Sequence, residues 1–404
     1  MAKFRVVLGR VVSAPERNDQ PFQLLGLGAA RANPGASMSF DPPADPLRYD
    51  PSVEAMEKDE AETTQGLIEQ MRKIAEITYA DGGHALRGVH AKPHGIVRGE
   101  LIVPADLPPV LAQGLFATAG RHDVVMRFST TPGDILDDNV STPRGLAIKV
   151  FDVAGPRLPG SEDASTQDFV LVNGKAFATP NAKAFLGNVK LLAGTTDKAE
   201  GLKKVLSAAL RGAETLIEAL GGESGPIKSL GGHPETHLLG ESYFSQAPIR
   251  FGDYIAKIGL RPISPALRAL TDAKVDLDGK PNGLREAVSE HFAAQGGEWE
   301  VMVQLRTDAD TMPIEDSHKP WPEDKSPYVP VARLVVEVQA SWDETRSPKI
   351  NDALAFSPWH GLAAHQPLGS IMRVRKAVYE ASQDFRLTRT GCPLREPASV
   401  AQIG

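Results

Sequence analysis

Residues 375–386 read Arg375-Lys376-Ala377-Val378-Tyr379-Glu380-Ala381-Ser382-Gln383-Asp384-Phe385-Arg386 and contain neither proline nor glycine, so they can form a helix. At about 100° per residue, Arg375, Tyr379 and Arg386 then lie on one face of that helix. A phenol is a poor iron ligand at neutral pH, but a neighbouring guanidinium favours the phenolate, which binds ferric iron. The same pattern is also typical of a surface helix with a solvated cationic face, so it does not establish a metal ligand by itself.

The composition of the 404-residue chain excludes several classes of protein. Its net charge of -7 argues against a general nucleic-acid-binding protein. The single cysteine, Cys392, excludes an intramolecular disulfide and a cysteine-rich zinc site. There is no apolar run long enough to span a membrane, and the apolar patch at the N-terminus is too short for a secretory signal. We therefore expect no membrane span and a cytoplasmic location.

Periodicity along the chain predicts an α+β protein. Residues 54–79, 182–221 and 284–295 have apolar side chains at helical spacing. Strand patterns occur at 89–103, 124–129, 145–153, 168–173, 250–259, 300–306 and 331–340. These strands favour a mainly antiparallel sheet or barrel. Because the region before residue 54 is rich in proline and glycine, we expect an irregular arm at 1–53, one domain at 54–390 and a short tail at 391–404.

Four polar residues in the strand-rich region are candidates for a functional site. His90 lies between an apolar residue and an alanine, and Asn173 ends a predicted strand. Arg127 and Ser129 are two residues apart, so they share one face of a strand. Taken one at a time, each of these residues is also compatible with a structural role in the core.

In their order and spacing, the segments that contain these residues resemble the haem catalase family. The segments are Arg87-Gly88-Val89-His90-Ala91-Lys92, Val125-Met126-Arg127-Phe128-Ser129-Thr130, Pro143-Arg144-Gly145, residues 168–177, Ala355-Phe356-Ser357-Pro358, and Arg375-x-x-x-Tyr379 with Arg386 after it. These separate segments are distributed between Arg87 and Arg386. Within that family the chain looks most like the small catalase-related haem proteins of bacteria.

The resemblance implies an eight-stranded antiparallel β-barrel of the catalase type with helical additions and one bound haem b, which is iron protoporphyrin IX. Tyr379 is implied to be the axial iron ligand, as tyrosine is in catalases generally. Arg375 is implied to hold Tyr379 as the phenolate. Arg87, Arg127 and Arg386 are implied to pair with the haem propionates, because the planar guanidinium fork suits carboxylates.

On the other face of the haem, the resemblance implies that His90 is the general acid and base. Asn173 is implied to donate the hydrogen bond that orients peroxide, and Ser129 to orient His90. The haem-contacting residues that the resemblance adds are Val89, Phe177, Phe185 and Phe356.

The implied function is a haem-dependent oxidoreductase that uses hydrogen peroxide or a small organic hydroperoxide through a ferryl intermediate. A second peroxide as reductant makes the enzyme a catalase, and an organic donor makes it a peroxidase. Two alternatives stay open, a fatty-acid hydroperoxide isomerase or lyase of the allene oxide synthase type and a non-catalytic haem carrier or sensor. Val89 favours hydrogen peroxide or a small organic hydroperoxide as substrate over lipid isomerisation, because a threonine commonly precedes the distal histidine in the allene oxide synthase branch.

The sequence also departs from the family pattern. Thr142 stands where many catalases carry an acidic residue on the peroxide channel, and Glu380-Ala381 follows the tyrosine in place of Pro-Asp. The chain is shorter than typical members, so an NADPH site in a C-terminal helical region is not expected. Family analogy suggests a homo-oligomer, for which the N-terminal arm is the expected contact.

Overall fold

The computed structural model describes residues 39–193, 233–390 and 396–403. These residues belong to one compact unit, Ser39–Gly404. The predicted arm at 1–53 and the predicted helices at 182–221 lie partly outside the described residues. The expected boundaries of the arm, the domain and the tail remain predictions.

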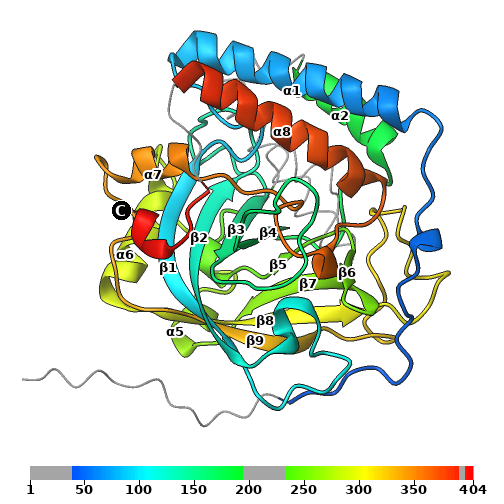
Figure 1. Cartoon of the computed structure of the whole chain (residues 1–404). Coiled ribbons are helices and arrows are strands. Elements are labelled where there is room, and N and C mark those ends of the chain that lie inside the picture. Colours follow the sequence, from blue (N-terminus) through cyan, green and yellow to red (C-terminus); the bar gives the residue numbers. More distant parts are fainter. Residues whose placement is uncertain (1–38, 194–232, 391–395, 404) are drawn as a thin grey trace, which may run out of the picture. The chain divides into compact units, whose positions relative to one another are not determined.

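A closed antiparallel barrel forms the centre of this unit (Figure 1). Its strands are β1 (Pro93–Val103), β2 (Gly120–Thr130), β3 (Arg144–Val150), β4 (Gln167–Val172), β5 (Tyr243–Phe244), β7 (Tyr254–Pro262), β8 (Gly297–Leu305) and β9 (Val329–Val336). The hydrogen-bonded order runs β5-β4-β3-β2-β1-β9-β8-β7, and pairing of β5 with β7 closes the ring. The short strand β6 (Ile249–Phe251) adds to β7 as a ninth strand. The expected eight-stranded barrel is thus confirmed.

Successive side chains of β2 and β3 point alternately into the barrel and toward its outer face. Met126 and Phe128 point into the main barrel core, whereas Val125 packs in a separate apolar cluster on the other face with Ala147. From Val125 to Ser129 the outer face of β2 is also buried, whereas Arg121 and Asp123 on the same face are exposed. The antiparallel register places Ser129 opposite Gly145, which brings two segments of the expected site side by side.

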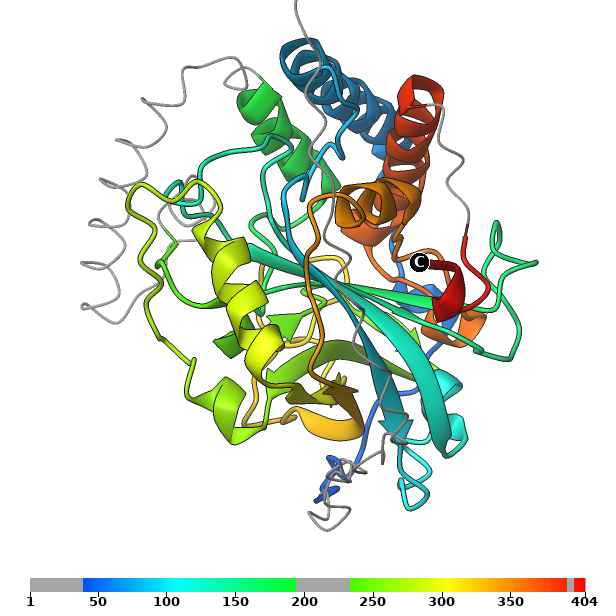
Figure 2. The ribbon, with the colours of Figure 1, turned by 90° about the vertical axis from the view of Figure 1, so that its left-hand side faces the viewer.

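Three helices lie together against one side of the barrel, as the two views in Figures 1 and 2 show. They are α1 (Glu60–Gly82), α2 (Ala182–Ala193) and α8 (Ser370–Thr390). An apolar cluster that includes Met71 of α1, Val189 of α2 and Val378 of α8 holds them together. Helix α1 ends at a glycine, since its C-cap residue Gly83 adopts the left-handed conformation with φ 66°. Helix α8 contains the whole predicted helix at 375–386.

The remaining elements are short. The helices are α5 (Pro265–Arg268), α6 (Gly283–Ala294) and α7 (Ser347–Ala353), and the 3-10 turns are η1 (Pro51–Val53), η2 (Gly114–Ala117), η3 (Leu238–Gly240), η4 (Ala363–His365) and η5 (Val400–Ile403). Helix α6 confirms the predicted helix at 284–295. Each predicted strand segment overlaps an observed strand.

A cluster of partly buried charges fixes the start of α8. Arg373 forms ion pairs with Glu54 at 2.7 Å, Glu60 at 2.8 Å and Glu315 at 2.9 Å. Glu315 also accepts a hydrogen bond from the backbone N–H of Ser370 at 2.7 Å, which suits the positive end of a helix. Segments far apart in the sequence therefore hold the N-terminus of α8 in place.

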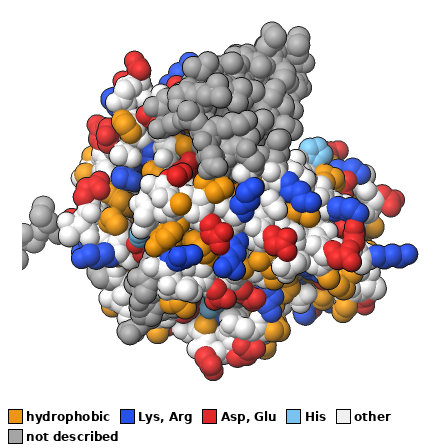
Figure 3. Space-filling view, turned by 90° about the horizontal axis from the view of Figure 1, so that it is seen from above, with side chains coloured by type: hydrophobic (Ala, Val, Ile, Leu, Met, Phe, Trp, Pro, Cys, Tyr) orange, Lys and Arg blue, Asp and Glu red, His pale blue; other side chains and the backbone are white. Residues whose placement is uncertain are grey.

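No helix among the described residues is long and apolar enough to cross a membrane. On the part of the molecule visible in Figure 3, basic and acidic side chains are interspersed. That face offers no extended basic surface of the kind that binds polyanions.

Acid is expected to destabilise the fold through buried histidines such as His365. Burial lowers the pKa of His365 to about 4, and its Nε2 atom accepts a hydrogen bond from the N–H of Leu115 at 2.9 Å. The unfolded chain takes up this proton near pH 6.5, so stability is complete above that pH and falls as the pH drops toward 4. The maximum loss from this one residue is about 3 kcal/mol.

The measurement is thermal unfolding at pH 7.5 and pH 5.0. The variant His365→Gln keeps an acceptor for Leu115 but does not titrate, so it should lose less stability between the two pH values than the natural chain. His318→Gln, at an exposed position, is the control for replacing a histidine with glutamine. Equal pH dependence in His365→Gln and the natural chain would contradict this assignment.

Candidate functional site

His90 lies in the short segment before β1 and is held in an unusual backbone conformation. Its φ is 54°, a left-handed value that a non-glycine residue adopts at a cost and that often marks a functional position. The backbone N–H of His90 donates to the carbonyl oxygen of Thr131 at 2.8 Å. Its Nδ1 atom lies 3.2 Å from Oγ of Ser129, so the predicted partner of His90 is adjacent to it.

Burial keeps His90 uncharged. Desolvation, together with the positive charges of Arg127, Arg375 and Arg87, lowers the pKa of His90 to about 3. A neutral imidazole at ordinary pH can accept a proton and then return it. The sequence alone does not show this environment, because two of these arginines are remote from His90 along the chain.

Gly145 leaves the space that the His90 ring occupies. A Cβ atom at this position would lie 2.3 Å from both Cε1 and Nδ1 of His90 and 3.0 Å from Oγ of Ser129. Any side chain on Gly145 therefore displaces the imidazole. The resemblance included Gly145 in a matching segment but gave it no role.

The predicted propionate-binding arginines gather around shared acceptors on α7 and just after it. Oδ1 of Asn351 accepts hydrogen bonds from Nη1 of Arg87 at 3.0 Å and from Nε of Arg127 at 2.8 Å. The carbonyl oxygen of Leu354 accepts from Nη2 of Arg87 at 2.8 Å and from Nη2 of Arg386 at 3.3 Å. Three arginines from β2, from α8 and from the segment before β1 thus lie close together.

These guanidiniums form a buried concentration of positive charge. Desolvation, followed by the charge of Arg386, lowers the pKa of Arg127 to about 9. The same causes, with Arg127 added, hold the pKa of Arg87 well below its usual value, and the carboxylate of Asp352 opposes them. Within the described residues, the hydrogen-bond acceptors of Arg87 and Arg127 are carbonyl and amide oxygens, which carry no full charge.

A ligand with carboxylates fits this cluster. Buried charges are stable when they are paired, and bidentate contacts between arginine and carboxylate are especially favourable. The two propionates of a haem have the required charge. Asn351, which orients Arg87 and Arg127, was not identified from the sequence, where nothing distinguishes it from other polar residues of a short helix.

Arg375 and Tyr379 meet on α8 as the helical spacing predicts. Nη2 of Arg375 donates a hydrogen bond to Oη of Tyr379 at 2.7 Å, and the guanidinium lies 5.2 Å from the centre of the Tyr379 ring. Nη1 of Arg375 also contacts Sδ of Met372 at 3.3 Å. The hydrogen bond places the guanidinium of Arg375 directly against the phenol oxygen of Tyr379.

Asn173 follows β4, and both ends of its amide are used. Oδ1 accepts a hydrogen bond from the backbone N–H of Arg144 at 2.8 Å. Nδ2 lies 2.7 Å from Nε2 of His233. Arg144 precedes Gly145, which lies against the ring of His90. The bond to Arg144 therefore links Asn173 to the segments around His90. The contact with His233 was not predicted.

The predicted apolar contacts fall into two groups. The rings of Phe177 and Phe185 meet edge to face with centroids 5.1 Å apart, and Phe185 and Val89 both pack on the apolar cluster that includes Val378 of α8. Phe356 belongs instead to the cluster that contains Val125 and Leu354, and the carbonyl oxygen of Leu354 accepts from Arg87 and Arg386. The two groups do not share an apolar cluster.

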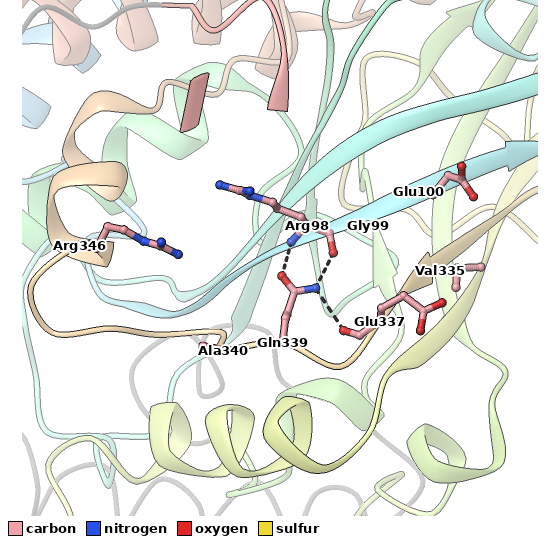
Figure 4. A pocket seen from close by; sticks show the side chains of 8 residues that line it. All are labelled: Arg98, Gly99, Glu100, Val335, Glu337, Gln339, Ala340 and Arg346. Carbon is pink, nitrogen blue, oxygen red and sulfur yellow. Dashed lines mark hydrogen bonds between the residues drawn. The ribbon is translucent and has the colours of Figure 1, made fainter. Parts of the chain in front are cut away.

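A groove of about 540 Å³ lies elsewhere on the barrel, between β1 and the segment after β9 (Figure 4). Its lining residues are Arg98, Gly99, Glu100, Val335, Glu337, Gln339, Ala340 and Arg346. Gln339 bridges the backbone N–H and carbonyl of Arg98 at 2.9 and 2.7 Å. None of the predicted site residues lines this groove.

No family model matches the sequence, and no curated protein sequence matches it. Solved structures do match its fold. A fungal catalase matches with a TM-score of 0.53 and 16% sequence identity, over 79% of this chain and 63% of that one. Catalase A from Saccharomyces cerevisiae matches with a TM-score of 0.52 and 16% identity, over 79% and 65% of the two chains.

A bacterial catalase gives a similar match, with a TM-score of 0.52 and 16% identity over 80% of this chain and 62% of that one. This chain thus spans less than two thirds of the length of these catalases. The match identifies the barrel with its helical additions as a catalase-type fold. At this level of identity the likeness is one of fold, and function has to be argued from the site.

Proposed function

We propose that this chain binds haem b and consumes peroxide, with residues 54–390 as its haem-binding domain. The observation that carries the proposal is the 2.7 Å hydrogen bond from Arg375 to the phenol oxygen of Tyr379. This bond places a cation against the oxygen that we propose as the iron ligand. The three catalases of matching fold support the same reading.

Arg87, Arg127 and Arg386 would hold the propionates, and Tyr379 would hold the iron. A haem iron with a tyrosinate ligand supplies the redox chemistry that breaks the O–O bond of peroxide. The chain supplies the binding, the orientation and the proton transfers.

Proton movement is assigned to His90, whose hydrogen bonds suit a base that acts through Nε2. If Nδ1 carries the proton, it donates to Oγ of Ser129 at 3.2 Å, and the Ser129 hydroxyl donates to the carbonyl oxygen of Gly145 at 3.4 Å. The neutral Nε2 atom then takes a proton from one peroxide oxygen and gives it to the departing oxygen, so that water leaves. Asn173 donates an N–H to orient the peroxide.

Hydrogen peroxide or a small organic hydroperoxide is the proposed substrate, with catalase or peroxidase turnover. The test is the haem-loaded protein supplied with hydrogen peroxide, with and without an organic donor, while oxygen release and donor oxidation are followed. We expect one or both. Full haem content with neither reaction would contradict the proposal.

Two controls separate the alternative functions. Turnover of a polyunsaturated fatty-acid hydroperoxide without a reductant, in the absence of hydrogen peroxide consumption, would instead identify an isomerase or lyase. A peroxide rate that is unchanged in His90→Ala would indicate a haem carrier or sensor.

A further inference from the structure

The side chain of His233 is buried and fully engaged beside Asn173. Its backbone N–H donates to the carbonyl oxygen of Ser141 at 3.2 Å, and only 7% of the residue is exposed. Its Nδ1 atom lies 2.7 Å from the carbonyl oxygen of Pro234. His233 thus ties its own segment to the loop that precedes β3.

These neighbours define which nitrogen of His233 carries the proton. A carbonyl oxygen can only accept a hydrogen bond, so Nδ1 of His233 must be the donor to Pro234. In the neutral ring Nε2 is then an acceptor, and its partner at 2.7 Å is Nδ2 of Asn173. The Asn173 amide therefore donates to His233.

The other end of the Asn173 amide agrees with this assignment. Its Oδ1 atom accepts from the backbone N–H of Arg144, which can only donate. Oxygen and nitrogen of the amide are thereby distinguished by their partners. Nη2 of Arg144 also donates to the carbonyl oxygen of Pro234 at 3.1 Å, which closes a ring of contacts through Asn173, Arg144, Pro234 and His233.

We propose that His233 is a positioning residue for Asn173, whose amide it fixes so that the second N–H remains for a peroxide oxygen. Among the described residues, that second N–H donates no hydrogen bond that would compete for it. His233 acts only through Asn173 and does not contact the substrate. The role of His233 in turnover rests on the proposed function, whereas its contact with Asn173 does not.

The variants His233→Leu and His233→Gln test the role in turnover. Leucine removes the acceptor, and we expect kcat/KM for hydrogen peroxide to fall about tenfold, which is the usual effect of losing one such hydrogen bond. Glutamine can accept from Nδ2 of Asn173, and we expect it to keep kcat/KM within about threefold of the natural protein. An equal loss in both variants, or no loss in either, would overturn the proposal.

A thermal-unfolding cycle tests the contact without reference to turnover. The single variants Asn173→Ala and His233→Leu and the double variant are compared with the natural chain, and we expect their stability losses to be non-additive. Additive losses would show that His233 does not hold Asn173. If the natural protein bound haem but consumed no peroxide, the proposed function would be wrong. The cycle would still show whether His233 holds Asn173. Should His233→Leu not fold, His233→Ala, which also removes the acceptor for Nδ2 of Asn173, replaces it in the cycle.

Discussion

The variant Tyr379→Phe is expected to lose peroxide turnover by on the order of a thousandfold and to retain haem poorly. Phenylalanine preserves the ring but removes the oxygen that would bind the iron and that accepts the hydrogen bond from Arg375. Because Tyr379 keeps some solvent accessibility at the surface of α8, we expect little change in folding. The measurements are haem content per chain and initial peroxide consumption.

Tyr254→Phe provides a matched control for that change. Tyr254 lies on β7, outside the predicted site, so its variant should keep both haem content and turnover. A Tyr379→Phe protein with full haem content and an unchanged rate would show that the iron ligand is another residue.

Replacing Gly145 with alanine is expected to reduce peroxide turnover about a hundredfold while haem binding is retained. The added Cβ atom would lie 2.3 Å from two atoms of the His90 ring, so the imidazole must move. Displacement of a proton-transfer group by about 1 Å is sufficient for a loss of this size. The rate and the haem content should be measured on the same preparations.

Gly88→Ala is the control for this variant, because Gly88 also lies close to His90 in the sequence. The nearest atom to a Cβ at Gly88 is Sδ of Met71 at 3.6 Å, an ordinary contact. Gly88→Ala should therefore have little effect on turnover. A similar rate in both variants would mean that the position of His90 does not control the reaction.

Local sequence patterns predicted much of this fold. The helical spacing at 375–386 is realised in α8, and the strand patterns fall on barrel strands. Barrel closure through β5 and β7 could not be derived from periodicity, because β5 contains only Tyr243 and Phe244. The eight-stranded barrel itself came from the family resemblance.

The contacts of the site likewise divide into those that local sequence patterns predict and those that they do not. Contacts within one helix, such as Arg375 with Tyr379, follow from the 3.6-residue period. Contacts between segments depend on strand register and loop paths, which local patterns do not contain. Asn351 and His233 were missed for this reason, although they contact the predicted residues Arg87 and Asn173 directly.

The most direct test of the central claim is a haem titration of the purified protein, followed by absorption spectroscopy. We expect binding of about one haem per chain and a high-spin ferric spectrum with tyrosinate ligation, which peroxide then changes. Failure to bind haem, or a spectrum of histidine or thiolate ligation, would contradict the assignment of Tyr379 and with it the proposed function.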